Sequence, residues 1–185
     1  MEIALDTGGS TVSGLLDRAD RAFATYVFAH GAGAGMRHPF MQAIAEGLAA
    51  RGVSVLRYQF AFMEAGSRRP DRPEVAHQAV RAAVSYAAGL APDLPLFAGG
   101  KSFGGRMASQ AQAGLPLPGV CALVFLGYPL HPAGKPSTER AEHLDAVRLP
   151  MLFLQGTRDA LAVEAMKVVH PTRSGEAVER REAEA

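Results

Sequence analysis

The sequence predicts an α/β fold, a three-layer α/β/α sandwich around a mostly parallel sheet. Short apolar, strand-favouring runs alternate with longer segments of helical periodicity. The runs are almost continuously apolar, which is typical of strands that are covered on both faces. Strand, helix, strand, helix at this spacing indicates parallel strands joined by right-handed crossovers. With 185 residues, the chain is long enough to bury a substantial core.

The predicted strands fall into an edge hairpin and a parallel set. Residues 2–5 and 11–16 flank the glycines at positions 8 and 9, which predicts an antiparallel hairpin at the sheet edge. The apolar runs of the parallel set are 25–29, 53–58, 95–98, 120–126 and 151–155.

Three helices are predicted between these strands. The first begins at Pro39, a favoured first-turn residue, and is stopped by Gly52. The second begins at Pro73 and carries an apolar stripe as far as Leu90. The third begins at Ser102 and runs to about residue 114. Long connections at 59–72 and 127–138 follow strands, where α/β proteins place their sites.

The composition is that of a soluble globular protein, with 48% hydrophobic and 20% charged residues. The 19 basic and 18 acidic residues are interspersed, so we expect no nucleic-acid partner. The first ten residues, MEIALDTGGS, lack the features of a signal peptide, and the most apolar segment is too short to span a membrane. We therefore expect a cytoplasmic protein without a membrane partner. Residues 1–170 are predicted as one domain, and 171–185 as a charged tail.

The single cysteine, Cys121, excludes a disulfide framework. It lies inside an apolar strand run, where a small core residue is the expected interpretation.

The motif with chemical content is G-x-S-x-G, present as Gly100-Lys101-Ser102-Phe103-Gly104 between a predicted strand and helix. A serine at such a turn has a strained backbone, so its neighbours two positions away must be small. The turn places the hydroxyl at the positive end of the helix, which favours developing negative charge. The alternative is a tight turn with a capping serine. A P-loop is excluded because position 95 is proline, and a dinucleotide fingerprint because position 36 is methionine.

A glycine-rich loop, HGAGAG at residues 30–35, follows the run 25–29. In hydrolases of this architecture, such a loop supplies one oxyanion-hole N–H and the residue after the nucleophile supplies the other. These would be the N–H groups of Ala32, or alternatively Gly33, and of Phe103. Asp159, at the end of the last clear strand, fits the chain order serine, acid, histidine. An N-cap role is the alternative for Asp159, and the two roles are compatible.

At these residues the chain resembles the α/β-hydrolase superfamily, most closely the bacterial KANL/Tex-type hydrolase-like proteins, which are distantly related to dienelactone hydrolases. The matching segments are 29–41, 56–64, 97–109, 125–136 and 153–161. The resemblance implies an α/β-hydrolase fold with Ser102 as nucleophile and Asp159 as acid. Some eukaryotic relatives are subunits of chromatin complexes.

One departure from the family concerns the catalytic base. Family members continue through another helix and strand to a histidine-bearing loop, and here the fold is shortened at its C-terminal end. His170 is the only histidine after Asp159, so we predict it as the base. The alternatives are His131, in the loop after the run 120–126, and no base at all in a shortened or frameshifted chain. His30 is expected to bond locally, and the other three histidines to lie on the surface or in packing.

Two functions follow. The first is a serine hydrolase acting on a small ester or thioester through a Ser-Asp-His type mechanism, without metal or cofactor. The second is a catalytically inactive hydrolase-like module that binds a partner. Its exposed sheet edge would also permit a homo-oligomer. A weaker idea is that Arg68, Arg69 and Arg72 bind an anion, the alternative being a solvated loop.

Overall fold

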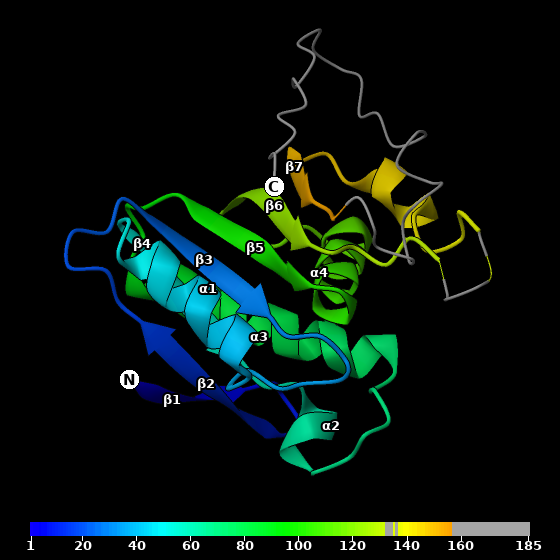
Figure 1. Cartoon of the computed structure of the whole chain (residues 1–185), viewed down its shortest axis with the longest axis horizontal. Coiled ribbons are helices and arrows are strands. Elements are labelled where there is room, and N and C mark those ends of the chain that lie inside the picture. Colours follow the sequence, from blue (N-terminus) through cyan, green and yellow to red (C-terminus); the bar gives the residue numbers. More distant parts are fainter. Residues whose placement is uncertain (132–134, 136, 157–185) are drawn as a thin grey trace, which may run out of the picture.

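The computed structural model describes residues 1–131, 135 and 137–156, which form a mostly parallel sheet with helices on both faces (Figure 1). The strands lie in the order β1-β2-β4-β3-β5-β6-β7. Their bounds are β1 (Glu2–Asp6), β2 (Thr11–Asp17), β3 (Ala24–Ala29), β4 (Val53–Tyr58), β5 (Leu96–Lys101), β6 (Val120–Leu126) and β7 (Met151–Leu154). β1 and β2 form the predicted antiparallel hairpin at one edge, and β3 to β7 are parallel. The predicted fold class is confirmed.

The helices cover the two faces of the sheet. Their bounds are α1 (Pro39–Ala49), α2 (Ala61–Glu64), α3 (Pro73–Leu90), α4 (Phe103–Gly114) and a 3-10 helix, η1 (Glu142–Ala146). α1 lies on one face, and α3 and α4 lie side by side on the other (Figure 1). None of the helices in the described residues is both long and apolar enough to cross a membrane.

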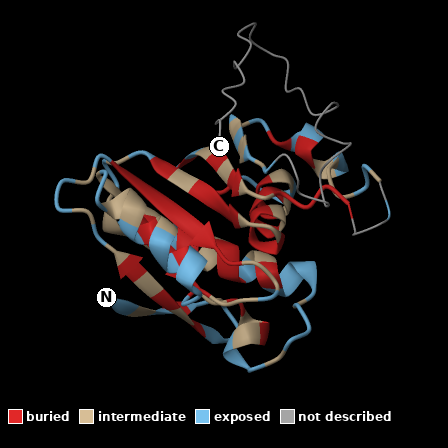
Figure 2. Ribbon diagram, viewed as in Figure 1, coloured by how far each residue is buried: buried red, intermediate tan, exposed pale blue. Residues whose placement is uncertain are grey.

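The central strand β3 explains why the sequence pattern is continuous rather than alternating. All six of its residues are buried, which Figure 2 shows as an unbroken red strand. Val27 and Ala29 pack into the core beneath α3 and α4, whereas Tyr26 and Phe28 pack into the smaller core beneath α1. Both faces of the strand are therefore shielded from solvent, which favours apolar residues on both.

Two element boundaries differ from the prediction. α1 ends at Ala49 rather than at Gly52; Gly52, with φ +86°, closes the following turn and donates its N–H to the Ala49 carbonyl oxygen at 3.1 Å. β5 continues beyond residue 98 because Gly99 and Gly100 pair with Val124 and Phe125 of β6. Glycine usually weakens a strand, but here its lack of a side chain permits close strand packing.

The core position predicted for Cys121 is wrong, because this side chain is exposed. Cys121 precedes Leu123, the first residue of β6 that pairs with β7. It therefore lies in the part of the strand that β7 does not reach.

Candidate active site

Ser102 occupies the sharp turn between β5 and α4. Its φ of 50° and ψ of −115° make it the only non-glycine residue with positive φ in the described part of the chain. Such a conformation costs on the order of 1–3 kcal/mol and persists only where its surroundings enforce it. The Ser102 N–H donates to Leu126 O at 3.2 Å, and Ser102 O accepts from Arg106 N at 3.1 Å. The side chain makes no capping hydrogen bond, so the capping interpretation does not describe this serine.

The glycines around Ser102 are required by close backbone contacts. A Cβ on Gly104 would lie 2.5 Å from the His30 carbonyl oxygen, and one on Gly100 would overlap the carbonyl oxygen of Ala29. A Cβ on Gly105 would lie 2.9 Å from the Gly100 carbonyl oxygen. β5, the start of α4 and the end of β3 can therefore meet only because these positions lack side chains.

A cavity of about 250 Å³ opens beside the Ser102 turn. It is lined by Gly31, Ala32, Gly33, Ala34, His38, Phe40, Met41, Lys101 and Ser102. A Cβ built on Gly31 would lie 3.8 Å from the Cβ of Ser102, so the loop and the serine are in direct proximity. The cavity thus joins the serine and the glycine-rich loop that the sequence singled out. Phe103 is the first residue of α4, and the N–H of such a position has no acceptor within the helix.

His30 anchors the start of the glycine-rich loop. This fully buried side chain accepts the Phe60 N–H at its Nε2 at 3.0 Å, so its Nδ1 carries the proton and donates to Gly31 O at 2.7 Å. Burial lowers the pKa of His30, against a smaller opposing effect of the Gly31 hydrogen bond, and this favours the neutral ring. The expected local bond of His30 is present at Gly31, whereas its second bond, from Phe60, comes from a distant part of the sequence.

His38 is the one described histidine that lines the cavity. Its Nδ1 accepts the Phe40 N–H at 3.2 Å as the N-cap of α1. A neutral ring that accepts at Nδ1 carries its proton on Nε2, so it cannot also take a proton there. His38 thus lines the cavity while its Nδ1 is engaged in capping α1. His131 is 4% exposed and does not line this cavity.

His143 is half-buried and belongs to a polar network between η1 and α4, which agrees with the packing role that was one of its two expected roles. Its Nε2 lies 2.7 Å from Ser109 Oγ and 3.3 Å from the Tyr128 hydroxyl. Burial, followed by the nearby Arg106 and His77, lowers the pKa of His143 to about 4. Ser109 is 0% exposed and also donates to Arg106 O at 2.9 Å. This serine–histidine pair is inaccessible to a substrate and joins η1 to α4.

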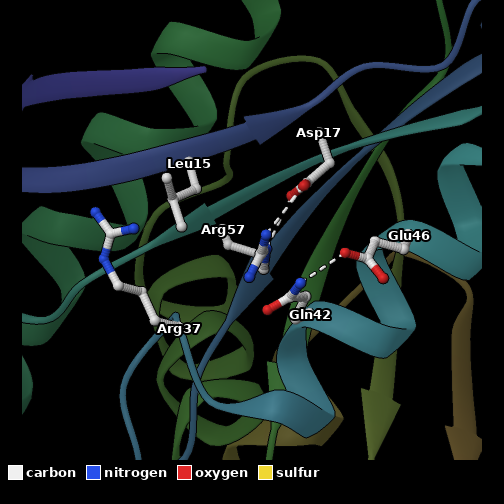
Figure 3. Close-up of a pocket in the computed structure, with 6 residues that line it drawn as sticks. All are labelled: Leu15, Asp17, Arg37, Gln42, Glu46 and Arg57. Atoms are coloured by element: carbon white, nitrogen blue, oxygen red, sulfur yellow. Dashed lines mark hydrogen bonds and ion pairs between the residues drawn. The ribbon is translucent and has the colours of Figure 1, made fainter.

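A larger cavity of about 380 Å³ lies away from Ser102 and is built from charged residues that already have partners (Figure 3). Arg57 Nε donates to Asp17 Oδ2 at 2.8 Å, and Gln42 Nε2 donates to Glu46 Oε1 at 2.7 Å. Arg37 points away from the Arg57 pair and bonds Glu2 Oε1 at 2.6 Å. Because Arg37 and Arg57 are already paired with carboxylates and Glu46 accepts from Gln42, we regard the smaller cavity, which Ser102 lines, as the candidate site despite its size.

Arg57 also supports the loop that ends at the cavity. Its Nη1 donates to Met36 O at 2.9 Å, while Gln59 Oε1 accepts the Met36 N–H at 2.9 Å. The N–H and the carbonyl oxygen of Met36 are thus both hydrogen-bonded, one to Gln59 directly after β4 and the other to Arg57 in β4. The sequence signal for this role is the single charged residue in the mostly apolar run 53–58.

Replacing Arg57 with methionine is expected to lower the free energy of unfolding by about 3 kcal/mol, because it leaves Asp17 and the Met36 carbonyl without their buried partner. Urea unfolding measures the change. Arg37→Met is the matched control: its ion pair with Glu2 is 60% and 72% exposed, so a change within about 0.5 kcal/mol is expected. Equal effects of the two variants would contradict the assigned role of Arg57.

The predicted site residues divide into two groups. Ser102 and Ala32 line one cavity, and Phe103 directly follows Ser102 at the start of α4. Asp159 and His170 lie outside the described residues, as does the tail 171–185. Within residues 1–156, excluding 132–134 and 136, no cluster of histidine, cysteine and carboxylate side chains is suited to hold a metal ion.

Comparison with known proteins gives a family match and several similar folds. A family model described as "Alpha/beta hydrolase domain" matches residues 22–176. An alpha-beta serine hydrolase homologue from Coxiella burnetii aligns with a TM-score of 0.74 at 16% identity, over 90% of this chain and 79% of that one. A serine hydrolase without a lid from Xanthomonas campestris gives 0.71 at 21%, over 90% and 76%. Dienelactone hydrolase from Anabaena variabilis gives 0.62 at 19%, over 89% of both chains. A search of curated proteins finds no match.

Proposed function

The chain belongs to the alpha/beta hydrolase domain family, and from that premise we propose that it is a serine hydrolase acting on a small ester or thioester. The observation that carries the proposal is Ser102, held at φ 50° between β5 and α4, without a capping bond and beside a cavity of about 250 Å³. Strain maintained at a residue that lines a cavity is a feature of functional sites. The five matching segments support a place near the KANL/Tex-type hydrolase-like proteins within this family.

In the proposed reaction, Ser102 Oγ attacks the acyl carbon and a base accepts its proton. The negative charge then develops on the former carbonyl oxygen, which the N–H groups of Ala32 and Phe103 would stabilise. Collapse of the intermediate breaks the bond to the leaving alcohol or thiol, which receives the proton from the base. Water then hydrolyses the acyl-enzyme by the same sequence, releasing the acid and restoring Ser102.

His170 is the proposed base, with Asp159 orienting its ring. Support for this assignment comes from the other histidines. His30 uses both ring nitrogens, His38 uses its Nδ1 to cap α1, and His143 bonds Ser109, which does not line the cavity. His77, on α3, and His131 do not line the cavity.

A fluorophosphonate probe tests the proposal, because it reacts covalently with an activated serine. The wild-type chain is expected to be labelled, and Ser102→Ala is expected not to be. Ser109→Ala provides a matched control, because Ser109 is hydrogen-bonded to His143 but is fully buried. Its replacement is expected to leave the labelling unchanged. Comparable labelling of wild type and Ser102→Ala would overturn the assignment of the nucleophile. Slower labelling of His170→Gln, but not of His131→Gln, is expected if His170 is the base.

The second candidate function is binding without catalysis. The observation that favours it is β7, the last strand of the sheet among residues 1–156, where Leu152 and Leu154 are 49% and 52% exposed. Exposed apolar side chains on an edge strand favour pairing with another chain, including a second copy. A chain that is not labelled and sediments as a dimer would support this function. A labelled monomer would contradict it.

A further inference from the structure

The residues that line the cavity beside Ser102 include one lysine and no carboxylate. Lys101 contributes an ammonium group, and His38 carries its proton on Nε2 because Nδ1 accepts the Phe40 N–H. The glycine-rich loop adds backbone N–H groups. No aspartate or glutamate is among the lining residues. Such a wall favours a ligand that brings acceptors and negative charge.

Lys101 is held at this cavity by an aromatic contact. Its Nζ lies 4.9 Å from the centroid of the Phe40 ring, close enough for a cation–π interaction. The ion pairs in the described part of the chain, Arg37–Glu2 and Arg57–Asp17, involve other residues. Lys101 thus presents a charge to the cavity that no described carboxylate neutralises. Because Lys101 directly precedes Ser102, a group bound to it lies near the reacting centre.

We propose that this cavity selects acyl substrates that carry a carboxylate on the acyl chain, with Lys101 as the residue that recognises it. The part of this inference that concerns turnover rests on the proposed function, whereas the binding of a carboxylate by Lys101 does not. The remaining wall, from Ala32, Ala34, Phe40 and Met41, suits a short aliphatic chain, and a volume of about 250 Å³ limits its length. One lysine matches the single charge of a carboxylate better than a phosphate monoester, which carries about 1.5–2 charges.

Two matched esters test the proposal by turnover. The p-nitrophenyl hemisuccinate has an acyl carboxylate, and its methyl ester is the neutral counterpart of nearly the same length. For the wild-type chain, kcat/KM after subtraction of the uncatalysed rate is expected to be about tenfold higher for the hemisuccinate. Lys101→Met is expected to abolish this ratio mainly through KM, and Lys101→Glu to reverse it. Lys101→Arg is expected to retain most of it.

Arg18→Met is the matched control, because it removes the same charge from an exposed residue beyond β2, outside the lining of the cavity. Its hemisuccinate ratio is expected to equal that of the wild type. If Arg18→Met lowers the ratio as much as Lys101→Met, then net charge rather than this cavity selects the substrate, and the proposal is overturned.

Binding is measured separately with monomethyl succinate and, as the neutral ligand, dimethyl succinate. In amide NMR spectra of the Ser102→Ala chain, monomethyl succinate is expected to shift the signals of residues 31–34, and Lys101→Met is expected to suppress these shifts. Turnover without a charge preference supports the serine hydrolase and overturns the substrate class. Binding that depends on Lys101 without any turnover overturns the proposed function and supports the anion site. If neither binding nor turnover is observed, both the proposed function and the proposed substrate class are overturned.

Discussion

Replacement of Ser102 with alanine is expected to lower kcat/KM for p-nitrophenyl butyrate at least about 1,000-fold, because it removes the hydroxyl that would form the acyl-enzyme in the proposed reaction. The remaining rate would reflect only binding beside the loop amides. Initial rates of p-nitrophenolate release measure the change. The fold should be retained, since the Ser102 side chain makes no capping hydrogen bond. A folded Ser102→Ala chain with more than a tenth of the wild-type activity would contradict the proposed mechanism.

Ser102→Gly separates the cost of the strained turn from the loss of the nucleophile. Glycine adopts φ 50° without the steric penalty of a Cβ, whereas alanine retains that penalty. The free energy of unfolding of the glycine variant is therefore expected to be about 1 kcal/mol higher than that of the alanine variant. Both variants are expected to be inactive. Urea unfolding of the two variants provides the comparison. A less stable glycine variant would indicate that the turn is not strained.

Most strands could be predicted from the sequence because burial on both faces of the sheet requires continuous apolar runs. Such runs can be recognised without knowing which residues are in contact. β4 and β6 begin and end where predicted; Gly52 precedes β4, and Gly119 and Gly127 flank β6. The end of β5 was missed for a physical reason. Gly99 and Gly100 resemble a loop in sequence, but the close approach of β3 and β6 requires them inside the strand.

Only the part of the candidate site that is formed by residues adjacent in sequence could be predicted. Ser102 and its glycines are contiguous, so their spacing carries the signal. The bond between His143 and Ser109 joins residues far apart in sequence, and nothing in the sequence near either one indicates it. The tautomer of His38 likewise depends on a hydrogen bond to the Phe40 backbone, which spacing does not reveal. The hydrogen bonds of these histidines therefore depend on the folded conformation, whereas the G-x-S-x-G turn around Ser102 is formed by adjacent residues.

Replacement of Gly99 with alanine is expected to destabilise the chain by more than about 4 kcal/mol, a large share of the roughly 5–15 kcal/mol that keeps a single domain folded. Gly99 has a φ of +151°, which disfavours any residue with a side chain. A Cβ at this position would overlap the Val124 carbonyl oxygen and lie 2.8 Å from its carbonyl carbon. Neither atom can move away, because both belong to the backbone of the neighbouring strand β6. Soluble yield, circular dichroism and urea unfolding measure the effect.

Gly89→Ala is the matched control for Gly99→Ala. Gly89 lies in α3, and a Cβ there would meet no atom within 4 Å, so a gain of about 0.5–1 kcal/mol is expected. The same chemical change is thus expected to have opposite signs at the two glycines. If Gly99→Ala folds with wild-type stability, then β5 does not approach β6 as closely as described. Since β5 ends beside Ser102, and Leu126 of β6 accepts the Ser102 N–H, the turn that presents the serine depends on this same close contact.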